Sequence, residues 1–138
     1  MAQTRTQKAM TRAWQDVTLV SEMPKETRDI YGGLCHQFPV LLRTCGLCQA
    51  LAFSADKGTK SNERGRAHQA LLSHVKNILQ SEGLVGNGNQ DALAAVRAMD
   101  MAGYVRSTQV LLDHWIFYKR FAVSVLKVET SEAAKDGI

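Results

Sequence analysis

The sequence predicts an all-α fold, a compact bundle of about five helices with a long C-terminal helix. Only two prolines, Pro24 and Pro39, interrupt the 138 residues, whereas the helix-favouring residues Ala, Leu, Gln, Lys and Arg are abundant. No segment shows the sustained alternation of apolar and polar residues that is typical of strands. The length fits one domain over residues 1–138, which is long enough to bury its own hydrophobic core.

The first predicted helix covers residues 4–20. Its apolar side chains recur at helical spacing and lie on one side, which indicates an amphipathic helix. Arg5, Lys8 and Arg12 lie on another side of the same helix. This basic stripe should therefore face solvent or a partner.

The next two predicted helices meet at Pro39. The second covers residues 24–38, because Pro24 suits a first helical turn and Pro39 should end or kink the helix. The third covers residues 40–54 and carries apolar residues on all sides, so it should lie centrally in the domain or be buried against a partner. Gly46 within it would let another backbone approach closely.

A basic loop and three further helices are predicted in the rest of the chain. Residues 57–66 form a turn-rich loop that carries much of the net positive charge. Helical spacing of apolar residues predicts helices over residues 67–80, 91–99 and 102–128. The polar residues 129–138 are expected to be a frayed tail.

Charge and cysteine content limit the possible partners and location. Lys and Arg total 17 against 13 Asp and Glu, a net charge of +4 that permits polyanionic partners but is modest for a dedicated reader of duplex DNA. Three cysteines fit no small disulfide framework, so a reducing, cytoplasmic location is expected. The polar N-terminal residues predict no secretory signal, and the longest apolar run is too short to span a membrane.

Four potential metal ligands lie close together in the sequence: Cys35, His36, Cys45 and Cys48. The spacing of Cys45 and Cys48 occurs in zinc and redox sites. However, the pair lies inside an apolar predicted helix and no second Cys-x-x-Cys accompanies it. The favoured interpretation is therefore that the cysteines are small apolar core residues.

The remaining histidines, His68, His74 and His114, share no helical face with one another or with a suitable carboxylate. They are predicted to be surface or capping residues. No nucleophile motif and no general acid–base pair stands out either. We therefore expect no catalytic residue, no metal and no cofactor.

The last predicted helix combines charges with aromatic residues. Residues seven apart share one polar face, namely Arg106, Asp113, Arg120 and Lys127, with Lys119 beside them. Three aromatic residues surround these cations: Phe117, Tyr118 and Phe121. Aromatic residues flanked by basic ones stack on bases next to bound phosphates, or they pack inside the protein, and both interpretations stay open here.

Two segments are similar to a known family. The first is Phe38-Pro39-Val40-Leu41 followed by Gly46-Leu47-Cys48-Gln49-Ala50-Leu51-Ala52-Phe53. The second combines Tyr104, Arg106 and Thr108 with Phe117-Tyr118-Lys119-Arg120-Phe121-Ala122. In motifs, order and length the chain resembles the small α-helical subunit of the type III-B CRISPR Cmr effector complex. It departs at Phe117, where the family usually has Trp, and at Cys45, where a small polar residue is common.

The resemblance implies a helical subunit without a catalytic centre. Such subunits stack in several copies beside the backbone subunits that hold the guide RNA, and they help to form the channel for target RNA in antiviral defence. RNA cleavage belongs to the backbone subunit, and cyclic oligonucleotide synthesis belongs to the large subunit. The implied partners are the other Cmr subunits, especially the backbone subunit, further copies of this chain, the CRISPR guide RNA and single-stranded target RNA, with no membrane.

Contact with RNA is then expected from basic residues in the loop and the last helix: Lys57, Lys60, Arg64, Arg66, Arg106, Lys119 and Arg120. Arg43 has two interpretations. It is either a buried residue paired with a carboxylate, or an interface residue that reaches RNA or a neighbouring subunit.

Two other classes of function remain possible. A stand-alone helical regulator would bind duplex DNA, although no helix-turn-helix pattern is present. A small enzyme or metal-binding redox protein would be built around Cys35, Cys45 and Cys48 and would bind stoichiometric zinc.

Overall fold

The computed structural model describes residues 2–128, and these residues form helices and loops without a strand. The described part of the chain contains six helices: α1 (Arg5–Ser21), α2 (Lys25–Cys45), α3 (Leu47–Lys57), α4 (Glu63–Ser81), α5 (Ala92–Arg97) and α6 (Met101–Ser124). The predicted all-α class and the long helix near the C-terminus are confirmed. The predicted frayed tail, residues 129–138, lies outside the described residues. No described helix has the length and apolar character needed to cross a membrane.

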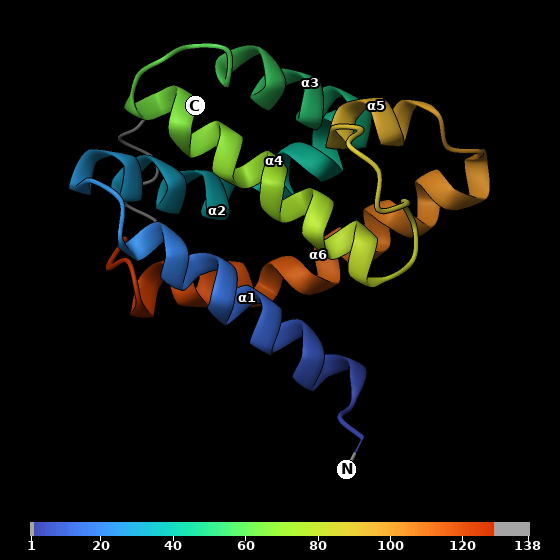
Figure 1. Ribbon diagram of the computed structural model, residues 1–138, viewed down its shortest axis with the longest axis horizontal. Helices are drawn as coiled ribbons and strands as arrows, with labels where there is room; N and C mark the ends of the chain where they lie inside the picture. The colour runs from blue at the N-terminus through green and yellow to red at the C-terminus, as the bar shows by residue number, and fades with distance from the viewer. Residues whose placement is uncertain (1, 129–138) are drawn as a thin grey trace.

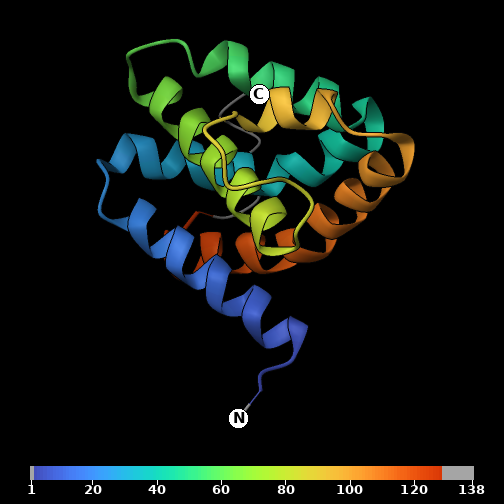
Figure 2. The ribbon, with the colours of Figure 1, turned by 45° about the vertical axis from the view of Figure 1, so that its right-hand side comes forward.

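The helices pack around one continuous apolar core. α4 lies across the front of the molecule, α2 packs against both α4 and α6, and α1 packs mainly against α6 (Figures 1 and 2). α3 and the short α5 cover the other side of α4. The N-terminal turns of α1 project beyond the bundle, which leaves both sides of this end of the helix accessible.

Polar side chains fix where most of the helices begin. Thr4 and Gln7 form a reciprocal capping box at the start of α1. Asn62, Asp91 and Asp100 each accept a backbone N–H from the first turn of α4, α5 and α6. These side chains satisfy donors that have no partner inside the helix, so the sequence defines the helix starts locally.

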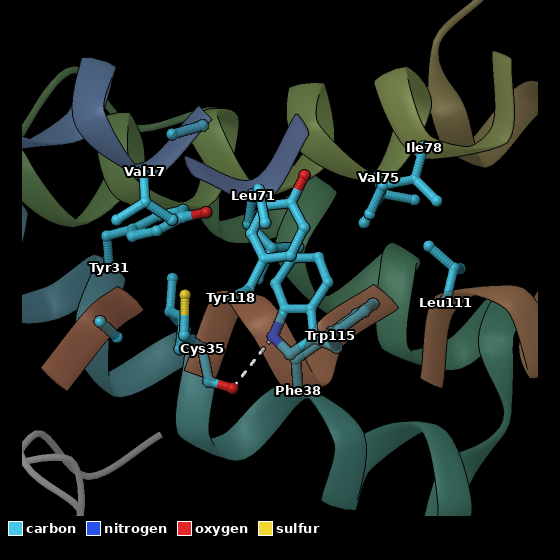
Figure 3. Close-up of a cluster of buried hydrophobic side chains, with 14 of the residues drawn as sticks. Val17, Tyr31, Cys35, Phe38, Leu71, Val75, Ile78, Leu111, Trp115 and Tyr118 are labelled. Atoms are coloured by element: carbon cyan, nitrogen blue, oxygen red, sulfur yellow. Dashed lines mark hydrogen bonds between the residues drawn. The ribbon is translucent and has the colours of Figure 1, made fainter. Parts of the chain in front are cut away.

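Pro39 lies inside α2 rather than at its end, so the predicted boundary at Phe38 was wrong. A proline in a helix provides no N–H for the carbonyl four residues earlier, which here belongs to Cys35. The indole Nε1–H of Trp115, on α6, donates to this carbonyl at 2.9 Å (Figure 3). The tertiary hydrogen bond replaces the missing helical one, and α2 continues for another six residues to Cys45.

The single helix predicted over residues 40–54 is interrupted at Gly46. This glycine has a φ of 85° and separates α2 from α3. The Tyr104 hydroxyl accepts the backbone N–H of Cys48 at 3.0 Å and so caps the first turn of α3. The segment is also less central than predicted, because Val40, Arg43 and Cys45 are exposed.

α6 ends at Ser124, four residues earlier than predicted, because the chain reverses direction there. Lys127 adopts a left-handed φ of 63°, and the Val128 N–H donates to the Ala122 carbonyl at 3.0 Å. Val128 is thereby buried against Gly32 of α2, where a Cβ would overlap the valine side chain. The glycine in the middle of α2 therefore makes room for the segment that follows α6.

The core contains a connected set of aromatic side chains (Figure 3). Trp115 stacks on Tyr118 with ring centroids 4.4 Å apart and contacts Phe38 at 4.7 Å. Tyr118 and Tyr31 also lie near His74, whose Nδ1 is 2.6 Å from the Tyr31 hydroxyl. These contacts join α2, α4 and α6.

The prediction that three histidines are surface or capping residues was wrong. His68, His74 and His114 are all buried in the described structure. His68 Nδ1 lies 3.1 Å from the Ser54 hydroxyl, and His114 Nε2 lies 3.4 Å from Glu82. Polar neighbours from other helices allow these rings to be buried, and such neighbours are invisible in the local sequence.

Candidate nucleic-acid interface

The eight predicted RNA-binding residues lie in separate parts of the structure. Lys57, Lys60, Arg64 and Arg66, here called the loop cluster, surround the connection between α3 and α4. Lys119 and Arg120, the α6 cluster, lie near the end of α6. Arg43 and Arg106 belong to neither cluster. The predicted residues therefore form several basic surfaces rather than one.

The loop cluster is built partly on helices. Lys57 is the last residue of α3, and α4 already begins at Glu63, so the loop predicted over residues 57–66 is shorter than expected. Lys57 Nζ lies 5.6 Å from the centroid of the Phe53 ring, within the range of a cation–π contact. Lys60 is exposed in the loop itself. Cations beside a half-buried aromatic ring are a common arrangement on surfaces that bind nucleic acid.

Glu63 partly neutralises the loop cluster. Its carboxylate accepts the Thr27 hydroxyl and pairs with Arg66. The hydrogen bond from Thr27, followed by the interactions with Arg66, lowers the pKa of Glu63. The carboxylate is therefore ionised at neutral pH and competes with any phosphate for Arg66.

His68 is buried beneath the loop cluster. Burial, with smaller contributions from Arg64 and Lys57, lowers the pKa of His68 from 6.5 to about 4. The ring is therefore neutral in the folded protein at pH 7. Protonating it would place a positive charge in a buried site that already faces two cations.

This arrangement predicts a loss of stability in mild acid. The unfolded chain binds a proton at His68 below about pH 6.5, whereas the folded chain does so only near pH 4. The free energy of unfolding should therefore fall as the pH drops through this interval. Urea titrations between pH 7.5 and 4 should show a smaller fall for His68→Gln than for the natural protein. Equal falls would contradict a neutral buried His68.

The α6 cluster borders a shallow groove between α2 and α6. The groove has a volume of about 430 Å³ and is lined by His36, Ile116, Lys119, Arg120, Val123 and Ser124. Lys119 and Arg120 are exposed, as an interface requires. Of the three aromatic residues around them, Tyr118 and Phe121 are buried and pack in the core. Base stacking is therefore excluded for these two rings, and only Phe117 is partly exposed.

The two remaining predicted residues are exposed as well. Arg43 lies in the last turn of α2, so the interpretation as a buried, paired arginine was wrong. Arg106 shares a helix with Arg120, but the two lie about 21 Å apart along the axis at 1.5 Å per residue. Arg106 lines a different cleft of about 400 Å³, together with Arg5, Asp113 and Phe117.

The predicted site did not include the basic face of α1. Arg5, Lys8 and Arg12 all line a cleft of about 440 Å³ between α1, the end of α4 and His114 of α6. Arg5 Nη2 lies 2.6 Å from Glu82 Oε2. The signal in the sequence was the spacing of three and four residues between these cations, which places them on one face of a helix.

A comparison with protein families adds to this geometry. Residues 5–125 match the model of a family described as "CRISPR-associated protein (Cas_Cmr5)". The match covers all six helices. The chain belongs to the Cmr5 family. This result confirms the resemblance that the two sequence motifs suggested.

A sequence comparison and a structure comparison agree with membership of the Cmr5 family. The chain is 30% identical over 102 residues to "CRISPR system Cmr subunit Cmr5" of Thermus thermophilus, an alignment that covers 74% of this chain and 80% of the relative. The crystal structure of a CRISPR-associated Cmr5 family protein from Thermus thermophilus is also similar, with a TM-score of 0.70 at 28% identity. That match covers 92% of this chain and all of the other.

The cysteines of this Cmr5 family member occupy three different environments. Cys35 is buried, and burial raises the pKa of its thiol, so it is an unreactive core residue as predicted. Cys45 is exposed and Cys48 is half-buried, so the prediction that Cys45 is a core residue was wrong. The described residues contain no group of three or more His, Cys, Asp or Glu side chains placed to hold a metal ion.

Proposed function

We propose that this chain is a non-catalytic, one-domain subunit of a cytoplasmic type III-B CRISPR effector, in which several copies stack along the guide-bearing backbone and help to hold target RNA. The observation that carries the proposal is the match of residues 5–125 to the Cmr5 family. The relative from Thermus thermophilus is described as a subunit of the CRISPR Cmr system. The partners of this chain would then be the other Cmr subunits.

The basic residues at the surface support a role in holding RNA: Arg43, Lys60, Arg66, Arg106, Lys119 and Arg120 are exposed, and Lys57 and Arg64 are half-buried. We propose that RNA is contacted by Arg43, Lys57, Lys60, Arg64, Arg66, Arg106, Lys119 and Arg120. Base pairing with the guide would read the target sequence, so the protein needs only to bind backbone and shape. Cations distributed over several surfaces suit this task better than a single deep pocket, because each can neutralise one phosphate.

The exposed apolar residues of α6 support self-association. Met101 is 83% exposed, Val105 62% and Ile116 61%, and Val123 is exposed further along the same helix. The spacings of four, eleven and seven residues keep them on one side of α6. Large apolar side chains that share one exposed side of a helix are typical of surfaces that contact another protein. A head-to-tail contact that does not close on itself would generate the proposed stack.

The direct test is the native mass of a guide-loaded Cmr complex assembled with and without this chain. A mass gain equal to two or more copies per complex is expected. Assembly of the other subunits with no gain in mass would contradict the proposal. Exchanging Lys119 and Arg120 for Glu should then weaken binding of target RNA at low salt, and unchanged affinity would remove the α6 cluster from the interface.

A further inference from the structure

We infer that the cleft along α1 is an additional binding site for the ribose-phosphate backbone of single-stranded RNA, and that the Arg5–Glu82 ion pair limits its affinity. The inference rests on the proposed function for the identity of the polyanion. It goes beyond that function because it assigns a surface outside the eight predicted residues. It also assigns a role to the Glu82 carboxylate, which contacts Arg5 of α1 and His114 of α6.

The position and lining of the cleft suit an extended polyanion. The N-terminal half of α1 projects from the bundle (Figures 1 and 2). The cleft lies beside this projecting half, whose residues are largely exposed. Arg5, Lys8 and Arg12 face this cleft from successive turns. The remaining lining consists largely of small or uncharged polar residues: Gln3, Ala9, Thr11, Gln15 and Ser81. Amide and hydroxyl groups at such positions donate hydrogen bonds to phosphate oxygens and sugars.

The cleft keeps a net positive charge when the Arg5–Glu82 ion pair inside it is counted as neutral. Within residues 2–128, Glu82 is the only carboxylate in the lining, and Arg5 neutralises it at 2.6 Å. Burial lowers the pKa of His114, so this histidine is neutral and adds no further cation. Lys8 and Arg12 form no ion pair with any residue in the described part of the chain. Two cations therefore remain available for phosphates.

A second cleft continues the first on the other side of Arg5. The two clefts share Arg5, Ala9, Glu82 and His114. The second adds Arg106 as a cation, Asp113 as a carboxylate and Phe117 as a partly exposed aromatic ring. Cations that follow a backbone, with an aromatic ring on which a base stacks, are the usual elements of a surface that binds single-stranded nucleic acid. The geometry thus connects Arg106, which is isolated from the α6 cluster, to the basic face of α1.

Glu82 lies at the junction of the two clefts. One carboxylate oxygen lies 2.6 Å from Arg5 and the other lies 3.4 Å from His114. A phosphate that approaches Arg5 competes with this carboxylate for the guanidinium, and it also meets the negative charge of Glu82. Removing that charge should strengthen RNA binding, whereas removing a carboxylate with a purely structural role would not.

The test measures binding of a fluorescently labelled, single-stranded RNA oligonucleotide to the full chain by anisotropy at several salt concentrations. Lys8→Gln/Arg12→Gln should weaken binding at least about fivefold and reduce the salt slope by about 1.4, since each phosphate contact on a single strand contributes about 0.7. Glu82→Gln should bind about twofold to fivefold more tightly. Lys76→Gln/Arg97→Gln removes the same charge outside both clefts and is the matched control.

Three results would overturn the inference. Binding by Lys8→Gln/Arg12→Gln that equals the matched control would show that only net charge matters. Unchanged or weaker binding by Glu82→Gln, with circular dichroism showing an intact fold, would exclude the role of Glu82. Failure of Lys8→Gln/Arg12→Gln to enter the complex in the absence of target RNA would make the cleft a protein contact. Failure of the proposed function is distinguishable, because the unmodified chain would then not enter the complex.

Discussion

Replacing Trp115 with alanine should lower the free energy of unfolding by about 3–5 kcal/mol, which is a large part of the stability of a domain of this size. Trp115 is fully buried and contacts Phe38 and Tyr118. The substitution removes this packing and leaves the Cys35 carbonyl without its donor. Urea denaturation followed by circular dichroism measures the loss. An unfolded variant at 25 °C would agree with the upper end of the range.

Trp14 provides the control for this substitution, since it is the other tryptophan of the chain. It is 50% exposed and contacts Phe121 with only one edge. Trp14→Ala should therefore cost less than about 1.5 kcal/mol. Equal losses for the two tryptophans would contradict the central position of Trp115 in the core.

A double-mutant cycle isolates the hydrogen bond that Trp115 provides. Trp115→Phe keeps most of the ring volume but removes the Nε1–H, so Cys35 loses its partner because Pro39 has no N–H of its own. In a Pro39→Ala background the new backbone N–H at residue 39 can serve the same carbonyl. Trp115→Phe should then cost about 1 kcal/mol less than it does with Pro39 present. Additive losses would show that the indole is not a substitute for the helical donor.

The second large effect is expected at the contact between Tyr118 and Asp16. Asp16 of α1 is buried, and the Tyr118 hydroxyl donates to its carboxylate at 2.5 Å. Burial and the neighbouring carboxylate raise the pKa of Tyr118, so the hydroxyl keeps the proton that it donates. Among the residues that the structure describes, Tyr118→Phe leaves only Asn77 Nδ2, at 3.4 Å, as a hydrogen-bond donor to the carboxylate. The free energy of unfolding should fall by about 1.5–3 kcal/mol.

Tyr104→Phe is the matched control for Tyr118→Phe. The Tyr104 hydroxyl also bonds to another helix, but the side chain is half-buried and its partner is the backbone N–H of the half-buried Cys48. Its loss should cost only about 0.5–1.5 kcal/mol. In addition, Tyr118→Phe should cost much less when Asp16 is already Asn or Ala. A full loss in that background would assign the effect to packing rather than to the hydrogen bond.

Most helices could be predicted from the sequence because their signals are local. The starts of α1, α4, α5 and α6 depend on a capping side chain within three residues, and apolar spacing determines the buried faces, although the prediction began α4 at residue 67 rather than at Glu63. The continuation of α2 through Pro39 depends instead on an indole 80 residues away in the sequence. No local rule contains that donor, so the prediction placed a helix end where the structure has none.

The candidate site was predictable to a smaller extent. Exposure of Lys60, Lys119 and Arg120 followed from their charge. The significance of the α1 face was hidden, because a stripe of cations becomes a cleft only when α4 and α6 close its other sides. Similarly, the aromatic residues beside Lys119 could not be divided into buried and accessible rings before their neighbours were known.

The contact between α1 and α6 also has a consequence for the order of events during synthesis. The Asp16–Tyr118 hydrogen bond joins residues that are 102 positions apart, and α6 is the main packing partner of α1. At about 5–20 residues per second, a ribosome needs on the order of 5–20 s to make the intervening chain. During that interval the apolar face of α1 lacks the cover that α6 provides. Completion of the fold must therefore wait for translation of α6. Until then, a chaperone that binds amphipathic helices would find its target in α1.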